Sequence, residues 1–155
     1  MSGRPTGCFL LREMVRDDLA QVVRIERASF SQPWPRSSFE HELEVPFSRS
    51  LVAYRRGARD EVLGYFVRWL VAEEIHLLNL ATRRDTRGLG LGRKMAMTVL
   101  AEARREAARM VTLEVSVHNV AARALYESLG FRIVRRRRDY YAPRDHALVA
   151  EWEPS

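Results

Sequence analysis

The segment that decides the fold reads Arg87-Gly88-Leu89-Gly90-Leu91-Gly92 and continues into Arg93-Lys94-Met95-Ala96. Its three glycines can adopt positive φ and let a ligand approach the backbone closely. An apolar stripe with a spacing of four residues then predicts a long helix. Several backbone N–H groups could therefore turn together toward a phosphate at the positive end of that helix. The pattern predicts a pyrophosphate-binding loop between a strand and a helix.

The glycine spacing excludes the two commonest nucleotide motifs. A Walker A loop ends in Gly-Lys-Ser/Thr, and the dinucleotide loop places its third glycine three residues after the second, whereas this chain has Gly-x-Gly-x-Gly. Taken alone, the glycines could also form a flexible turn with no chemical role. The segments around the loop decide between these alternatives.

The length of the chain favours a single domain that spans residues 1–155, because 155 residues suit one hydrophobic core. No apolar run approaches the ~20 residues that cross a bilayer, and the N-terminal stretch has no apolar leader, so we expect a cytoplasmic protein without membrane contact. Cys8 is the single cysteine, which excludes an intrachain disulfide. The four histidines lack metal-ligand spacing, so we predict no metal site.

A formal charge of +6 would favour encounters with a phosphate-bearing cofactor. The densest basic cluster is the run of four arginines at residues 135–138. In a strand these side chains would alternate between two faces, so they would form no continuous patch. We therefore expect no specific nucleic-acid partner.

Periodicity and turn residues predict alternating strands and helices, and hence an α/β fold. The predicted strands cover residues 9–11, 50–54, 62–67, 75–81, 111–117, 131–134 and 147–152. One predicted helix begins at Asp17-Asp18 and buries Leu19, Val22, Val23 and Phe30. Three further helices are predicted over residues 37–43, over residues 91 to about 108, and from Asn119 to Gly130. The stripe of the long helix is Leu91, Met95, Val99 and Ala103, and we expect Met95 and Met97 to be packing residues.

Arg87-x-x-Gly90-x-Gly92 resembles the pyrophosphate loop of the GCN5-related N-acetyltransferases, the GNAT family. Residues 79–82, 113–115, 119 and 124–131 resemble further segments of that family in the expected order, so the resemblance covers nearly the whole chain. Residues 30–34 and 138–141 resemble its RimI-type branch, which acetylates protein N-termini. The resemblance implies a mixed, mostly antiparallel sheet of about seven strands with about four helices and a splayed central strand pair.

The resemblance also implies acetyl-CoA as co-substrate. Its binding residues would be Leu80, Ala81, Thr82, Arg87, Gly88, Leu89, Gly90, Leu91, Gly92, Arg93, Asn119 and Tyr126. In that family the backbone N–H at the position of Leu80 polarises the acetyl carbonyl. Asn119 could instead cap the following helix, and both roles stay open.

Acetyl transfer to an amine needs a group that accepts the amine proton and a group that protonates the departing thiolate. By the resemblance, Glu114 is the candidate base, on the polar face of an alternating strand, and Tyr126 is the candidate acid. The alternatives are a salt bridge from Glu114 to an arginine, and a tyrosine packed where helix meets sheet. His118 is a secondary candidate for proton relay, with a structural role as its alternative.

The resemblance places Phe30, Trp34, Glu114, Tyr140 and Tyr141 around the acceptor substrate, with the two tyrosines in a loop of the last hairpin. Trp34 and the tyrosine pair could instead be ordinary packing residues. Glu26 falls on the buried face of the first long helix. We expect it to be a structural partner of a backbone or arginine group, or a groove residue.

These observations predict transfer of acetyl from acetyl-CoA to a protein N-terminus, most specifically the N-terminal alanine of a small-subunit ribosomal protein. The amine would attack directly in a ternary complex. One alternative is a GNAT enzyme acting on a small amine or a lysine side chain, which the same core supports. The other is a catalytically silent acyl-CoA-binding module. We expect a monomer or a weak dimer.

Overall fold

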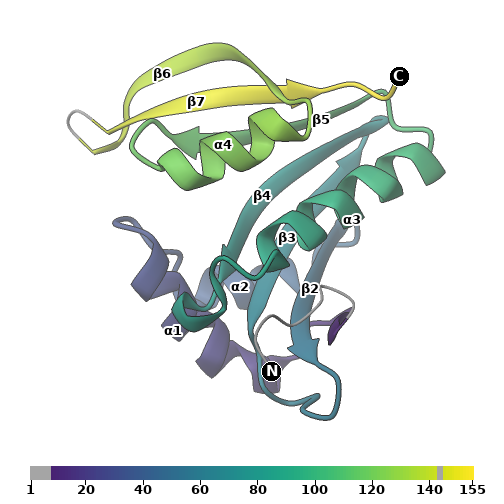
Figure 1. Cartoon of the computed structure of the whole chain (residues 1–155), viewed down its shortest axis with the longest axis vertical. Coiled ribbons are helices and arrows are strands. Elements are labelled where there is room, and N and C mark those ends of the chain that lie inside the picture. Colours follow the sequence, from purple (N-terminus) through teal and green to yellow (C-terminus); the bar gives the residue numbers. More distant parts are fainter. Residues whose placement is uncertain (1–7, 143–144) are drawn as a thin grey trace. The chain divides into compact units, whose positions relative to one another are not determined.

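The computed structural model describes residues 8–142 and 145–155, and Figure 1 shows the order of their elements. In chain order they are β1 Phe9–Glu13, α1 Leu19–Ser29, α2 Arg36–Glu42, β2 Ser48–Arg55, β3 Gly64–Val71, β4 Glu74–Thr82, α3 Leu91–Arg105, β5 Met110–Ser116, α4 Val120–Ser128, β6 Arg132–Ala142 and β7 Asp145–Trp152. Among the described residues the strands form one seven-stranded sheet with the order β1-β2-β3-β4-β5-β7-β6. The α/β class, the mixed sheet and the four helices of the described chain confirm the predicted fold class.

The described residues group into two compact units. Unit 1 comprises the chain up to Arg68 together with Asn79–Met95, and unit 2 comprises Trp69–Leu78 and Ala96–Ser155. The prediction of a single domain over residues 1–155 stays a prediction. None of the helices in the described ranges is long and apolar enough to cross a bilayer.

In unit 1, β1 runs antiparallel to β2, from Phe9 opposite Arg55 to Glu13 opposite Leu51. Helix α1 buries the predicted apolar face, and Glu26 is buried with it. Phe30 was predicted on that face but lies just past the helix, where its backbone is already extended (φ −131°, ψ 145°) and its side chain is half-buried. The helix ends one residue earlier than the apolar spacing suggested.

Helix α3 starts in unit 1 and continues into unit 2. All four residues of its predicted stripe are buried. The helix ends at Arg105, before the predicted end near residue 108, because Ala107 adopts a positive φ of 54° that no helix contains. Met97 was predicted to pack but is 52% exposed, since it lies off the stripe.

In unit 2, the first residues of β4 pair in parallel with β5, Glu74–Leu77 against Met110–Leu113, and both strands continue beyond this pairing. β5 then pairs antiparallel with β7. Leu113 and Val115 are buried while Glu114 is partly exposed, which confirms the predicted alternation of faces. The side chain of Glu114 therefore lies on the polar face of an otherwise buried strand.

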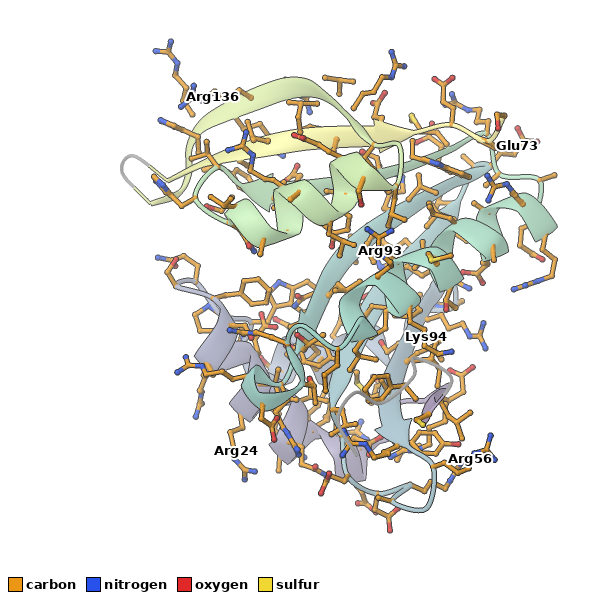
Figure 2. All side chains as sticks on the ribbon, viewed as in Figure 1. Arg24, Arg56, Glu73, Arg93, Lys94 and Arg136 are labelled. Carbon is orange, nitrogen blue, oxygen red and sulfur yellow. The ribbon has the colours of Figure 1, made fainter. Side chains whose placement is uncertain are left out.

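Strand β6 is longer than predicted and pairs antiparallel with β7, with register shifts between Ile133 and Arg135 and between Arg137 and Ala142. It carries the chain through Tyr140 and Tyr141, so the predicted loop position of these tyrosines is wrong. The arginines at 135–138 lie in this edge strand and all four are exposed. Figure 2 shows Arg136 pointing away from the ribbon.

Candidate functional site

The glycine loop of unit 1 has much of the predicted backbone geometry. Gly88 and Gly90 adopt positive φ of 82° and 85°. A Cβ at Gly88 would meet no atom within 4 Å, so a glycine is favoured here by the backbone conformation and not by a steric clash. Gly92, the third glycine of the run, lies in the first turn of α3 and does not use the positive φ that a glycine allows.

Hydrogen bonds hold the loop against the start of α3. The backbone N–H of Leu89 donates to the Thr86 carbonyl at 3.3 Å, and the buried Thr86 hydroxyl donates to the Arg83 carbonyl at 2.7 Å. The Gly90 carbonyl accepts the Lys94 N–H at 3.0 Å. Because the first four N–H groups of an α-helix have no partner within the helix, the loop presents donors at a positive helix end. These residues fit an anionic ligand such as a pyrophosphate.

Strand β4 runs beside Gly64 of β3 in unit 1. A Cβ on Gly64 would lie 2.9 Å from the Ala81 carbonyl oxygen and 3.1 Å from the Met95 side chain. Gly64 therefore permits a close approach of β3 to the segment formed by Leu80, Ala81 and Thr82. Sequence reasoning assigned no role to Gly64, although a glycine inside a strand pattern is a known signal of close backbone contact.

Glu26 is the centre of a buried polar cluster in unit 1. It is 1% exposed. Its Oε1 accepts the Tyr65 hydroxyl at 2.5 Å and the Asn79 Nδ2 at 2.9 Å, and its Oε2 accepts the Trp34 N–H at 3.0 Å. Burial, together with the adjacent Glu26 carboxylate, raises the pKa of Tyr65 above its ordinary value, so this hydroxyl stays protonated. The structural-partner prediction for Glu26 is confirmed, with a backbone group among its donors.

Aromatic rings surround this cluster. The Trp34 ring lies 5.2 Å from Phe39, and Phe39 meets Tyr65 edge to face at 5.7 Å. Phe39 and Tyr65 are fully buried, whereas Trp34 is partly exposed. Phe30 and Trp34 are the aromatic candidates for substrate contact in unit 1, and both keep some exposed surface.

Glu114, the candidate base, lies in unit 2 with its side chain 30% exposed. Its Oε1 accepts Nη1 of Arg137 at 2.5 Å, so the alternative predicted from sequence, a salt bridge to an arginine, is present. The Arg137 guanidinium also lies over the Tyr140 ring, 4.1 Å from its centre. Glu114, Arg137 and Tyr140 thus form one contact group; the side chain of Tyr141 is outside the described residues.

Tyr126, the candidate acid, is buried in unit 2 and packs against Phe131 with ring centres 5.5 Å apart. Burial raises the pKa of Tyr126 above its usual value because the charged form would lose its hydration. The hydroxyl therefore holds its proton firmly at neutral pH.

Asn119 caps α4, with its Oδ1 accepting the Ala122 N–H at 3.2 Å. This confirms the capping role, and a ligand contact would have to use its Nδ2. At the other end of the helix, Gly130 adopts the predicted positive φ, at 101°. His118 is exposed, and its backbone N–H donates to the Ser116 hydroxyl at 3.2 Å.

The predicted residues divide between the two units. Unit 1 brings together the glycine loop, the β4 residues 80–82, Phe30 and Trp34, whereas Glu114, Asn119, Tyr126 and Tyr140 belong to unit 2. Tyr65 and Gly64 are the residues that sequence reasoning missed. No group of three or more metal-ligating side chains occurs in the described parts of the chain.

Comparison with known proteins places this geometry in a family. The model of the acetyltransferase (GNAT) family matches residues 19–131. The chain belongs to the GNAT acetyltransferases. It is therefore an acyltransferase, and as a member of this family it uses acetyl-CoA as its acetyl donor.

Two relatives cover most of the chain. A Bacillus subtilis protein named putative ribosomal protein bS18-alanine N-acetyltransferase is 32% identical over 143 residues, which are 92% of this chain and 93% of that protein. The ribosomal protein bS18-alanine N-acetyltransferase of Escherichia coli K12 is 29% identical over 128 residues, or 83% and 84% of the two chains.

Solved structures agree with the fold. The crystal structure of the Escherichia coli ribosomal-protein alanine N-acetyltransferase superposes with a TM-score of 0.85 at 27% identity, covering 95% of this chain and 94% of the other. The NatC complex bound to Gag peptide and CoA superposes with a TM-score of 0.80 at 20% identity over 95% of this chain and 99% of that one, which supports the fold alone.

Proposed function

We propose that this GNAT enzyme transfers the acetyl group of acetyl-CoA to the N-terminal α-amine of a protein, and specifically to the N-terminal alanine of a small-subunit ribosomal protein. The observation that carries the proposal is the similarity, over 83% and 92% of the chain, to proteins named for this reaction. The partly exposed aromatics Trp34 and Tyr140 support it, because aromatic side chains are common contacts of peptide ligands.

The cofactor would be held mainly by backbone groups. Acetyl-CoA supplies a thioester whose acetyl carbon is open to attack by an amine. The N–H groups of residues 87–93 would bind its pyrophosphate at the start of α3, and β4 would offer the backbone of Leu80, Ala81 and Thr82 to the rest of the cofactor. Asn119 would add its Nδ2, since its Oδ1 caps α4.

Glu114 would accept the proton that the attacking amine loses, directly or through water. Its carboxylate is partly exposed, so an amine can reach it and take the place of its ion-pair partner Arg137. Tyr126 would protonate the departing thiolate with its buried hydroxyl, which carries its proton at neutral pH. Direct attack in a ternary complex requires no covalent intermediate on the protein.

The test is release of free thiol from acetyl-CoA by the purified protein. Three acceptors would be compared: a peptide beginning with alanine, the same peptide blocked at its N-terminus, and a panel of small amines and lysine-containing peptides. We expect thiol release with the free alanine peptide only. Turnover confined to small amines or lysine would overturn the N-terminal assignment, and absence of turnover with every acceptor would favour a silent acyl-CoA-binding module.

A further inference from the structure

Glu26 is a buried carboxylate that the proposed chemistry does not use. All the donors that the structure gives it are neutral: a tyrosine hydroxyl, an asparagine amide and a backbone N–H. A charge taken out of water is costly even when hydrogen-bonded, and an apolar residue of similar size often serves stability as well or better. The cluster is thus better explained by the geometry that it imposes than by a gain in stability.

The three donors belong to segments with different candidate roles. Trp34, a candidate residue for contact with the acceptor, lies in the connection between α1 and α2. Asn79 is the residue of β4 directly before Leu80, where the candidate cofactor segment begins. Tyr65, in β3, supports the Trp34 side through Phe39. One side chain therefore links the acceptor segment to the cofactor strand within unit 1.

We infer that Glu26 is a positioning residue that fixes the Trp34 segment relative to β4 and so sets the affinity for the peptide acceptor. This inference rests on the proposed function. Glu26 itself touches no substrate, because it is fully buried. Its Oε2 acts on the acceptor through the Trp34 backbone N–H, and its Oε1 holds β4 through the Asn79 amide.

The variant Glu26→Gln tests the role at constant side-chain size. A carboxylate offers two accepting oxygens, whereas an amide offers one and adds a donor, so one of the three donors loses its partner. We expect the KM for the alanine peptide to rise about tenfold, with the KM for acetyl-CoA changed by less than about twofold. The steady-state assay is thiol release with each substrate varied in turn.

Glu42→Gln is the matched control. Glu42 is also a buried glutamate of unit 1, and its Oε1 accepts the Ser48 hydroxyl at 2.7 Å, outside the Glu26 cluster. Both variants will lower the melting temperature, but only Glu26→Gln should change the peptide KM. Equal peptide KM values in the two variants would overturn the inference, as would an equal rise of both KM values in Glu26→Gln.

Tyr65→Phe decides the matter if Glu26→Gln does not fold. It removes one donor and keeps the carboxylate, so we expect a rise of about threefold in the peptide KM, and an unchanged KM would reject the role. Activity of the wild-type protein separates a failure of the proposed function from a failure of the positioning role. Wild-type protein without transfer to the alanine peptide contradicts the proposed function, whereas active wild type with unaffected variants contradicts only the positioning role.

Discussion

Unit 1 and unit 2 each hold one glutamate on which the proposed activity depends, and the two are held in opposite ways. Glu26 is buried and accepts three neutral donors from three segments, whereas Glu114 is partly exposed and pairs with the single cation Arg137. Exposed ion pairs are worth only about 0 to 1 kcal/mol, so Glu114 can exchange its partner for a substrate amine at little cost. Glu26 has no comparable access to a new partner, because it is buried and its oxygens accept from three segments. The arrangement of Glu114 suits a proton acceptor, and that of Glu26 suits a fixed support.

The largest expected effect is that of Glu114→Gln. Removing the proton acceptor should lower kcat by about 10²- to 10⁴-fold, while the dissociation constant for acetyl-CoA stays unchanged. Initial rates and calorimetric titration would measure the two quantities. Glu127→Gln, a similar change at an exposed position of α4, should keep full activity. A kcat of Glu114→Gln close to that of the wild type would remove the contrast between the two glutamates.

The two buried tyrosines sharpen the same comparison. Tyr126→Phe keeps the ring contact with Phe131 but removes the proposed acid, so kcat should fall about 10²-fold with the melting temperature nearly unchanged. Tyr65→Phe should instead raise the peptide KM with little change in kcat. A loss of kcat in Tyr65→Phe as large as that in Tyr126→Phe would show that the units do not divide the work in this way.

A third carboxylate combines both arrangements. Asp18 is buried like Glu26 but pairs with Arg12 at 2.7 Å, like Glu114 with its arginine. Burial disfavours its charged form, yet hydrogen bonds from Arg12 and from the Val15 N–H lower its pKa below 3.8. Because the pKa is lower in the folded state, this stabilisation is present above about pH 4 and is lost as the pH falls further.

Asp18→Asn should therefore cost about 2 kcal/mol of unfolding free energy at pH 7. The difference from wild type should shrink as the pH falls below about 4, because the stabilisation that comes from the lowered pKa of Asp18 is lost there. Urea unfolding of both proteins at several pH values measures this difference in unfolding free energy. A difference that is the same at both ends of the range would exclude ionisation of Asp18 as its source.

Arg137→Gln should have the smallest effect on stability, below about 1 kcal/mol, and 1 M NaCl should abolish most of it. Arg136→Gln, the neighbouring exposed arginine, provides the reference for a lost surface charge. The stability loss in Glu26→Gln should by contrast be insensitive to salt, because its cluster is buried. Urea unfolding at low and high salt compares the three variants, and a salt-resistant loss in Arg137→Gln would argue against a readily exchanged partner.

Local patterns predicted the local features of this fold. The alternation along β5 placed Glu114 on the polar face, and the glycine run indicated a segment that can adopt positive φ, as Gly88 and Gly90 do. Both features follow from neighbouring residues in the chain, which is the information that a sequence pattern contains.

Long-range contacts account for what the patterns missed. Tyr65 and Asn79 reach Glu26 across 39 and 53 positions, and no periodicity records such a pairing. Tyr140 lies in a strand rather than a loop because pairing of β6 with β7 extends the hairpin beyond its apolar residues. Gly92 is helical since α3 begins within the glycine run rather than after it.

The edge strand β6 has a consequence for handling the protein at high concentration. A free strand edge offers backbone hydrogen-bond partners to any other chain, and charged side chains along it oppose such intermolecular pairing. The exposed arginines at positions 135–138 lie on such an edge. Sequence changes that neutralise Arg135, Arg136 and Arg138 to simplify purification or crystallisation would weaken the repulsion that keeps neighbouring molecules from joining their sheets, and the cost would appear as aggregation rather than as lost activity.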